Sequence, residues 1–577
     1  MGLGSAFNIG RSALQASQLG VQVASNNLAN AATPGYARQT LGLEAIPGAG
    51  SSASIGRGVQ FTGVRRQIDE ALNARLNGAI SDAAAAQESS RILGSIETAL
   101  NELTDLDLSS ELGSFFTSFS ELANGTQSQS QVIEQGELLA GFMRRLRGDL
   151  VDQRNQLDDR LGALVEQADA LATEIAGLNE EIVRSEGGGV ATNNPLRDRR
   201  DELVRELSQL VDISTVEQAS GAIDVLVGSS PVVLGARSQG IELREIPAGD
   251  TIERRISVTA TSQVLDVTSG EIGGVLESRD GELDGMIETL DRLAGSMINE
   301  INRLHATGAT ADGLTSASST LVISPDDQSI AFNDPRNRTL GELPFPPTNG
   351  GFLVRVVDEA SGAVSTTRID VDLDGIDATG AAGFADDTSI QDIAAALNAV
   401  NGLSASVGSD GRLSINASQG TSFTFGEDSS GVLAALGVNS YFTGSDAQDI
   451  AVRDELRGSP SLLMTGRYVD GSFVENGTSL EIAGIQDNVV DSLDGDSASG
   501  FWRSAVQTFS VKAGSAQTVA EATAIVRDGL ESERLAVSGV DTDEESLSLL
   551  QFQRQYQGAA RIISTTNQLL DELLAIV

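Results

Sequence analysis

The chain has 577 residues, enough for about four domains with sizeable cores. Its formal net charge of −43 argues against nucleic acid or an anionic membrane as the main partner, because both would repel it. Cysteine is absent and His305 is the one histidine, which excludes disulfides, zinc–thiolate sites, cysteine nucleophiles and multi-histidine metal sites. Aromatic residues make up only 4 % of a chain with 62 glycines, which suits long helices and turn-rich β modules better than a deep aromatic pocket.

The start of the chain has neither a basic segment nor an apolar one, so we expect no cleaved secretory signal. No stretch reaches 18 apolar residues, and we therefore expect no membrane insertion.

Both ends of the chain predict a long helix with one packing stripe. Apolar or small residues recur every three or four positions at each end, and the helices would be about 40 and 50 Å long. Near the start the stripe consists of Phe7, Gly10, Leu14, Ser17, Val21, Ala24 and Leu28. Near the end it consists of Leu549, Phe552, Tyr556, Ala559, Ile563, Thr566, Leu570, Leu573 and Val577. Thr542 and Glu545 predict a capping box before the second helix.

Each stripe needs a partner, and two interpretations remain open. The simpler one is a helix pair within one chain. The other is that the ends stay loose in the monomer and become ordered only on assembly, which the many Ala, Ser and Asn residues of the first helix favour modestly.

The segment from residue 67 to residue 211 is predicted to be helical almost throughout. Leucine and isoleucine recur at helical spacing from Leu139 to Ile182, and the sequence Glu186-Gly187-Gly188-Gly189 would end that long helix. The period then changes to that of strands near Ile223 and Arg255, and a helix is expected from about Gly285 to Gly308.

Residues 320–450 resemble a separate α+β insert, and a helix is expected again after about residue 500. The clearest element of the insert is a hairpin with an Asp410-Gly411 turn between residues 403–407 and 413–416. A short helix from Ile390 to Val400 precedes it.

Asp370, Asp372, Asp374 and Gly375 match the first half of a calcium-binding helix–loop–helix loop. The twelfth position of such a loop needs a bidentate Glu and is Ala381 here. The same aspartates alternate with apolar residues, which predicts a half-exposed strand and no metal site.

No other residues predict catalysis. His305 lies in the last turn of a predicted helix, where a cation is favourable against the helix dipole. No Gly-x-Ser-x-Gly motif provides a nucleophile, and Lys512, the only lysine, lies in no phosphate-binding loop. With 81 carboxylates, any pair proposed as an acid/base dyad has no specificity. We therefore expect neither an enzyme nor a cofactor.

The segment that follows the first helix predicts a helix stop. Pro34 disfavours helical backbone at Thr33, and Pro34-Gly35 favours a type II turn that leads into an extended segment. Asn26, Asn27 and Asn30 precede this turn and have side chains that can bind the backbone of neighbouring segments.

At these residues the chain resembles the bacterial flagellar axial proteins. The resemblance rests on three segments: Ser12-Ala13-Leu14-Gln15-Ala16-Ser17-Gln18, Ser25-Asn26-Asn27-Leu28-Ala29-Asn30 and Thr33-Pro34-Gly35-Tyr36. Three further stretches resemble the hook-associated protein 1 family: residues 196–211, residues 301–308, and the ending from Ser538 through Leu549-Leu550-Gln551-Phe552 to Thr566. One departure is that Arg197 and Arg199 replace two positions of the family's usual Leu-Leu-Asp-Gln-Arg-Asp.

The resemblance implies a multidomain α+β fold, with terminal helices forming a coiled-coil stalk, a long helical bundle and inserted outer β-rich domains. The expected domains are a terminal axial coiled coil (1–66 and 541–577), a helix-rich stalk (67–211, 281–309 and 451–540), a β-rich domain (212–280) and an outer α+β insert (310–450).

The resemblance also implies a structural role, in which a ring of subunits joins hook to filament at the hook–filament junction and templates filament assembly. The implied partners are the hook protein, the second junction protein, neighbouring copies of the chain, an export chaperone at the C-terminal helix, and the flagellar type III export apparatus. The chain would then be extracellular, at the hook–filament junction, after export without a cleaved signal peptide.

The expected interface residues are Leu14, Val21, Asn26, Asn27, Leu28, Asn30, Pro34, Gly35, Tyr36, Leu549, Phe552, Tyr556, Ile563, Leu570 and Leu573. The alternatives are another axial protein of the hook or rod type and, from other classes, a secreted enzyme or an adhesin.

Overall fold

The computed structural model describes residues 3–47, 56–100, 107–187, 192–248, 251–341, 343–377 and 379–576. Its contacts divide the chain into two units: unit 1 holds residues 1–93, 156–279 and 514–577, and unit 2 holds residues 94–155 and 280–513. The long helices α2 (Glu70–Leu100), α4 (Gln129–Glu186) and α13 (Ala498–Ser538) contribute residues to both units. The multidomain α+β fold predicted from the sequence is confirmed.

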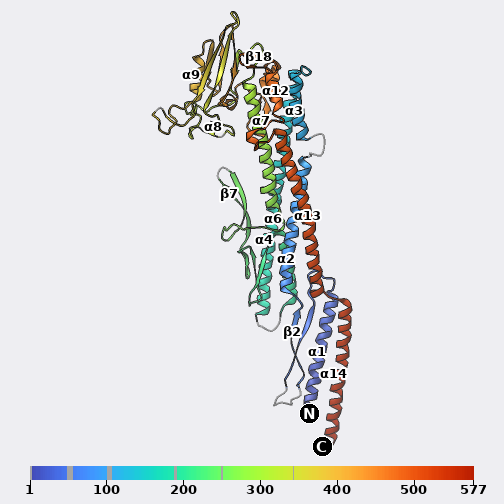
Figure 1. The fold of residues 1–577 in the computed structure, drawn as a ribbon. Helices are drawn as coiled ribbons and strands as arrows, with labels where there is room; N and C mark the ends of the chain where they lie inside the picture. The colour runs from blue at the N-terminus through green and yellow to red at the C-terminus, as the bar shows by residue number, and fades with distance from the viewer. Residues whose placement is uncertain are drawn as a thin grey trace. The chain divides into compact units, whose positions relative to one another are not determined.

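The two terminal helices of unit 1 lie side by side (Figure 1). Helix α1 (Leu3–Ala29) and helix α14 (Thr542–Ile576) run antiparallel, since Gly10 lies against Ile563 and Gly20 lies against Phe552. Of the two interpretations left open by the sequence, the structure shows the simpler one, a helix pair within one chain, and not the loose ends that the composition of the first helix modestly favoured. Val577 lies outside the described residues.

The cap of α14 differs from the prediction. Asp541, not Thr542, accepts hydrogen bonds from the backbone N–H groups of Asp543 (2.8 Å) and Glu544 (3.2 Å). Thr542 is already helical, and the carboxylate of Glu545 binds Arg38 instead of the cap backbone. An aspartate immediately before a helix is an equally good cap, which the threonine-based capping-box pattern overlooked.

A two-stranded hairpin follows the helix stop. Strand β1 (Gln39–Ala45) pairs antiparallel with β2 (Val59–Arg66), with a register shift between Gly42 and Leu43, and both strands contact α1. The sequence analysis expected an extended segment here but not its partner.

The rest of unit 1 consists of helices with a small β module. Helix α5 (Asn194–Leu210) leads into a four-stranded sheet in the order β3-β4-β5-β6, then a hairpin, β7-β8, and helix α6 (Gly270–Glu277). The strands are β3 (Ser214–Glu217), β4 (Ile223–Val227), β5 (Ser230–Leu234), β6 (Arg237–Ser238), β7 (Ile241–Ala248) and β8 (Thr251–Val258). The predicted long helix ends at Glu186 as expected, with Gly188 and Gly189 outside the described residues.

Unit 2 has an aromatic core beside helix α3 (Leu108–Ala123). Phe115, Phe119 and Tyr441 stack edge to face, with ring centroids 5.3–6.0 Å apart. The buried Tyr441 hydroxyl donates to the Val132 carbonyl of α4 (2.9 Å). Helix α7 (Asp284–Ala306) follows a π-helical turn (Ser278–Leu283) and matches the helix predicted from about Gly285.

Residues 310–450, called the insert below, form two three-stranded sheets around a core that Ala306 of α7 and Met464 also enter. The sheet orders are β11-β10-β14 and β12-β13-β9, and the predicted Asp410-Gly411 hairpin is β12-β13. The core includes Phe352, Ile415 and Phe423, all fully buried. The strands and helices are β9 (Ser316–Ser318), α8 (Arg338–Gly341), β10 (Gly350–Asp358), β11 (Val364–Val371), α9 (Ile390–Asn398), β12 (Leu403–Val407), β13 (Leu413–Ala417), β14 (Thr421–Gly426), α10 (Val432–Leu436) and β15 (Phe442–Thr443).

The strand predicted around the aspartate run is present but shorter than expected. β11 ends at Val371, so Asp370 lies on the strand while Asp372 and Asp374 lie in the loop after it. The remaining elements of unit 2 are β16 (Ala451–Val452), α11 (Asp454–Gly458), a 3-10 turn (Pro460–Leu462), β17 (Arg467–Val469), β18 (Ser472–Val474), α12 (Gly477–Gly484) and a second 3-10 turn (Asp491–Leu493).

Candidate assembly interface

Small residues of α1 make its contact with α14. An ideal Cβ at Gly20 would lie 2.4 Å from Cδ1 of Phe552, and one at Gly10 would lie 3.0 Å from Cγ1 of Ile563. Among the described residues, the apolar side chains that the two helices bury are those of three alanines, Ala16, Ala24 and Ala559. The seam therefore brings the two backbones close together at Gly10 and Gly20, and the apolar side chains that it buries fully are small.

Large apolar side chains of the pair remain in contact with solvent. Leu573 is 53 % exposed, Leu574 is 72 % exposed and Leu28 is 41 % exposed. Tyr556 and Leu570 are also exposed, whereas Leu14, Val21, Leu549, Phe552 and Ile563 are half-buried. Among the predicted interface residues, Phe552 and Ile563 lie against glycines of the partner helix, whereas Leu28, Tyr556, Leu570 and Leu573 are exposed.

The helix stop has the predicted type II turn. Pro34 occupies the second position and Gly35 the third, with φ +76°, and the Tyr36 amide donates to the Thr33 carbonyl (3.3 Å). A side chain at Gly35 would meet the Glu202 carboxylate of α5 at 2.8 Å. The turn therefore requires glycine for both its backbone angle and its close approach to α5.

Asn27 connects the end of α1 to the hairpin. Its buried amide accepts from the Gln39 N–H (3.0 Å) and donates to the Gln39 carbonyl (2.8 Å). The side chain thus pairs with both backbone groups of Gln39, as the backbone of a neighbouring strand would. The Tyr36 hydroxyl donates to Asn27 Oδ1 (2.8 Å), and Asn26 donates to the same hydroxyl (3.2 Å). Asn30 bonds back to Asn26. Burial, reinforced by nearby carboxylates, raises the pKa of Tyr36 to about 12, so this hydroxyl stays a donor.

Arg38 connects both ends of the chain. Its guanidinium donates to Glu545 (2.7 Å) and Glu544 (3.0 Å) at the start of α14. Its backbone N–H donates to the Ser538 carbonyl at the end of α13, and its carbonyl accepts from the Gln67 N–H. We call these contacts the Arg38 node. They hold the hairpin, α13 and α14 at one place.

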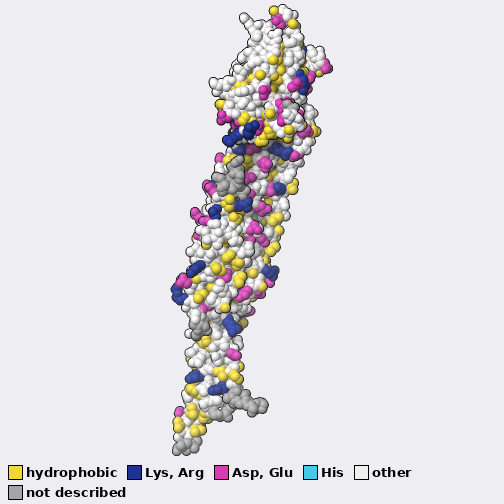
Figure 2. Space-filling model, turned by 90° about the vertical axis from the view of Figure 1, so that its left-hand side faces the viewer, with side chains coloured by type: hydrophobic (Ala, Val, Ile, Leu, Met, Phe, Trp, Pro, Cys, Tyr) yellow, Lys and Arg dark blue, Asp and Glu magenta, His cyan; other side chains and the backbone are white. Residues whose placement is uncertain are grey.

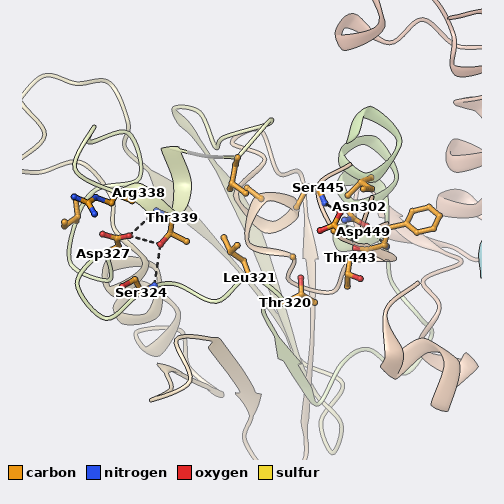
Figure 3. A pocket seen from close by; sticks show the side chains of 18 of the residues that line it. Asn302, Thr320, Leu321, Ser324, Asp327, Arg338, Thr339, Thr443, Ser445 and Asp449 are labelled. Carbon is orange, nitrogen blue, oxygen red and sulfur yellow. Dashed lines mark hydrogen bonds between the residues drawn. The ribbon is translucent and has the colours of Figure 1, made fainter. Parts of the chain in front are cut away.

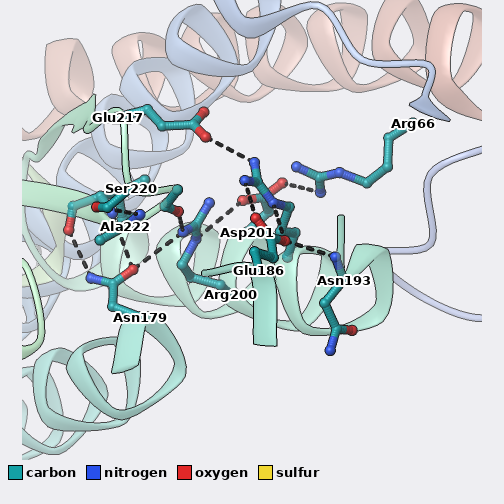
Figure 4. Close-up of polar contacts among 12 residues, drawn as sticks. Arg66, Asn179, Glu186, Asn193, Arg200, Asp201, Glu217, Ser220 and Ala222 are labelled. Atoms are coloured by element: carbon teal, nitrogen blue, oxygen red, sulfur yellow. Dashed lines mark hydrogen bonds and ion pairs between the residues drawn. The ribbon is translucent and has the colours of Figure 1, made fainter. Parts of the chain in front are cut away.

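A second polar network joins the hairpin and the β module to α5 (Figure 4). Arg66 at the end of β2 donates to Asp198 (3.0 Å) and Asp201 (2.7 Å) of α5. Burial raises the pKa of Asp198, although the paired Arg66 opposes this. The pair is partly desolvated, so removing either partner would leave an unpaired charge.

In the same network, Asn179 of α4 contacts both the β module and α5 (Figure 4). The fully buried Asn179 side chain donates to the Ile223 and Gly235 carbonyls (2.7 Å each), and its oxygen accepts from Arg200 (3.2 Å). Arg197, one of the departures from the family pattern, pairs with Glu186 (2.8 Å). The substituted arginine thus has a local carboxylate partner.

His305 is not a cation at a helix end, and this corrects the sequence analysis. It is fully buried, its Nδ1 lies 2.7 Å from the Asn439 carbonyl, and its Nε2 accepts from the Met464 N–H (3.1 Å). Nδ1 therefore carries the one proton of a neutral ring. Burial lowers the pKa of His305 to about 3, so the ring is a neutral structural bridge and not a base poised for catalysis.

An open pocket in unit 2 has a volume of about 920 Å³ (Figure 3). Its polar side chains support the surrounding loops. Asp327 accepts from Thr339 Oγ1 (2.7 Å), and Asn302 accepts from the backbone of Tyr441 (2.9 Å). Among its described lining residues there is no histidine, so no nucleophile there has a histidine base beside it.

Acidic side chains are spread widely over the face that Figure 2 shows, which fits the net charge of −43. Within the part of the chain that the structure describes, no helix combines the length and apolar character needed to cross a membrane.

The sequence located the terminal stripes and the turn but missed the contacts that fix them. Gly20 and the Arg38–Glu545 pair were not singled out as interface residues. A glycine between two helical apolar positions, and a carboxylate one turn inside α14, were the available signals.

Three segments of the chain match family models of flagellar proteins. Residues 93–318 match the family model of the flagellar hook-associated protein FlgK helical domain. Residues 7–36 match that of the flagella basal body rod protein, and residues 531–576 match that of the flagellar basal body rod FlgEFG protein C-terminal region.

The relatives are similar over the full length of both chains. Flagellar hook-associated protein 1 of Escherichia coli (strain K12) is 24 % identical over 607 residues, and that of Salmonella typhimurium (strain LT2) is 27 % identical over 588 residues, each covering 100 % of both chains. The structure of the flagellar hook junction protein FlgK from Burkholderia pseudomallei aligns with a TM-score of 0.48 and 16 % identity, over 81 % of this chain and 100 % of that one. With three family models and full-length relatives in agreement, the chain belongs to the flagellar hook-associated protein 1 family, whose members are structural proteins of the flagellum.

Proposed function

We propose that this chain joins the hook to the filament at the hook–filament junction and provides the surface on which the filament assembles. The observation that carries the proposal is the α1–α14 pair, which is held by a narrow seam of small residues while its large apolar side chains stay uncovered. Such a pair is suited to repeated head-to-tail contacts between copies, because one copy alone cannot bury that face.

The energetic argument depends on the leucines and isoleucines of α14. Burying one such exposed side chain contributes about 1.5–3 kcal/mol, so a few of them per copy supply the driving force for stacking subunits. The exposed members are Leu547, Leu550, Ile562, Leu569, Leu570, Leu573 and Leu574.

As a flagellar protein of this family, the chain interacts with the hook and other axial components. More specifically, we propose contacts with the hook protein, the second junction protein and neighbouring copies. The uncovered face of α14 also suits an export chaperone that would shield it before assembly. Absence of cysteine favours passage of the unfolded chain through the type III export apparatus, with the final location outside the cell. We propose no catalytic activity.

The test is electron microscopy of cells that lack this chain, with filament protein assayed in the medium. We expect hooks without filaments and filament protein lost to the medium. Restoring the chain with Leu570→Asp should fail to rescue filaments. Val489→Asp, which puts the same charge at a 70 % exposed loop position in unit 2, should rescue them.

Normal filaments on the deleted cells would refute the junction role. Finding the chain along the whole hook, instead of at its distal end, would favour a hook-type axial protein. Hydrolysis of peptidoglycan by the purified chain would favour the enzyme alternative.

A further inference from the structure

Three aspartates of the insert meet in the loop between β11 and α9. Asp372 and Asp374 follow the strand, and Asp387 lies three residues before the first residue of the helix. One carboxylate oxygen from each lies within 4.8 Å of the other two. In the part of the chain that the structure describes, none of the three carboxylates forms a salt bridge with an arginine or lysine, so three negative charges converge without a cation.

The buried member of the cluster has an oxygen without a partner. Asp387 is only 5 % exposed, and its Oδ1 is shielded from solvent without a hydrogen bond. Its Oδ2 accepts from Asn333 Nδ2 (2.7 Å) and from the Gly375 N–H (3.2 Å). The oxygen of that same Asn333 amide is also buried without a partner. An unpaired buried carboxylate oxygen is strongly unfavourable unless something positive contacts it.

The protein holds this loop in place from both ends. Two hydrogen bonds join Asp372 and Thr388: the Asp372 N–H donates to the Thr388 hydroxyl Oγ1, and the Thr388 N–H donates to the Asp372 carbonyl (2.8 Å each). Ser389 and Asp392 then cap α9 reciprocally. These hydrogen bonds hold the backbone that carries Asp372 and Asp387 between a strand and a helix.

We propose that Asp372, Asp374 and Asp387 bind one calcium ion. Carboxylate and amide oxygens are hard ligands, and Ca²⁺ tolerates an irregular set completed by water, whereas Mg²⁺ demands a near-ideal octahedron. The side chains of Asp372 and Asp374 are exposed, which leaves room for water ligands and an entry path. The site does not depend on the assembly role proposed above.

This site differs from the helix–loop–helix loop that the sequence excluded. Asp370, which would have been the first ligand of that loop, pairs with Arg368 (2.8 Å) on the strand. Ala381 still cannot serve as the twelfth ligand, and the third carboxylate comes from Asp387 instead. The spacing is therefore irregular, and a search for the regular loop pattern misses it.

The test is calorimetric titration of the full chain with Ca²⁺ alone, and with Mg²⁺ at matched ionic strength, combined with thermal unfolding. We expect one calcium site with a dissociation constant on the order of 0.1–1 mM, the range of partly exposed extracellular sites. Saturating Ca²⁺ should raise the melting temperature of the transition that includes the insert by roughly 3–6 °C.

The matched variants are Asp374→Asn and Asp370→Asn, which remove one exposed charge each, four residues apart. Asp374→Asn should weaken calcium binding at least tenfold and abolish the thermal shift, while Asp370→Asn should leave both unchanged. Asp387→Asn should abolish calcium binding. If this substitution of a buried residue prevents folding, the exposed variant Asp374→Asn still tests the proposal.

The proposal would be overturned if wild type and Asp374→Asn showed the same calcium binding and the same thermal shift. The effect of calcium would then be only the screening of a chain with net charge −43. Tighter binding of Mg²⁺ than of Ca²⁺ would overturn the assignment to calcium.

Discussion

The insert and the terminal helix pair use apolar residues in opposite ways. In the insert, Phe352, Ile415 and Phe423 are fully buried within one chain. In the pair, the buried apolar side chains among the described residues are alanines, while Leu573 and Leu574 are exposed. The insert buries its large apolar side chains, whereas the pair leaves large apolar side chains in contact with solvent. The assembly role proposed for the pair rests on this contrast.

The largest change in the free energy of unfolding is expected from a substitution in the core of the insert. Phe423→Ala removes a fully buried ring that packs edge to face with Phe425 at 5.4 Å, and should lower the free energy of unfolding by about 3–5 kcal/mol. Urea denaturation of the full chain measures this. Val364→Ala, at an exposed position of β11, is the control and should change stability by less than about 0.5 kcal/mol. A small loss in Phe423→Ala would show that the insert core is not self-sufficient.

The contact between α1 and α14 at Gly20 should tolerate little added volume. Gly20→Ala places a methyl group against the Phe552 ring and should destabilise the pair by about 1–3 kcal/mol. Gly558→Ala, where a Cβ meets no atom within 4 Å, should instead stabilise α14 by roughly 0.5–1 kcal/mol. Amide hydrogen exchange along α14 distinguishes the two. Equal protection in both variants would mean that the helices do not pack through Gly20.

A pH-dependent loss of stability should come from unit 2 through His305. The unfolded chain takes up a proton near the ordinary pKa of 6.5, whereas the folded ring has a pKa of about 3. Stability is therefore complete above pH 6.5 and decreases as the pH falls towards 3. Between pH 6.5 and 5 we expect a loss of about 1–2 kcal/mol, measured by urea denaturation. His305→Asn, although less stable, should not show this slope, and the same slope in both proteins would contradict the assignment.

The smallest change in the stability of the isolated chain is expected from a substitution on the uncovered face of α14. Leu574→Asn should change the free energy of unfolding of the monomer by less than about 0.5 kcal/mol, because the side chain is already in water. It should nonetheless weaken assembly, measured by sedimentation of copies incubated together and by filament formation in cells. If Leu574→Asn lowered the free energy of unfolding of the monomer as much as Phe423→Ala does, the distinction between the terminal pair and the insert would be lost.

The helices were predictable because their signal is local. Periodicity located the long helix that ends at Glu186, and the Pro34-Gly35 turn follows from the backbone preferences of two residues. The apolar stripes of the two terminal helices were also visible in the sequence. Which of their residues face the partner helix was not, since that depends on the close approach at Gly20, which only the tertiary structure defines.

Contacts between distant residues could not be predicted from spacing. His305 had the pattern of a helix-end cation, but the Asn439 carbonyl and the Met464 amide, both more than 130 residues away, make it a buried neutral bridge. The aspartate run failed the regular calcium pattern, and Asp387 joins it only through the fold of the loop. In both cases a local pattern was correct in itself and was overridden by tertiary contacts.

The Arg38 node also constrains the order of folding. Arg38 and Glu545 are 507 residues apart, so pairing α1 with α14 closes nearly the whole chain into a loop. Closing it costs about 2 kcal/mol more entropy than closing a loop one tenth as long. The insert, whose sheets pair within one segment, should therefore form first and the terminal pair last. Under the export route and the assembly role proposed above, the terminal pair would form only when the final helix has left the cell, which would delay self-association until export is finished.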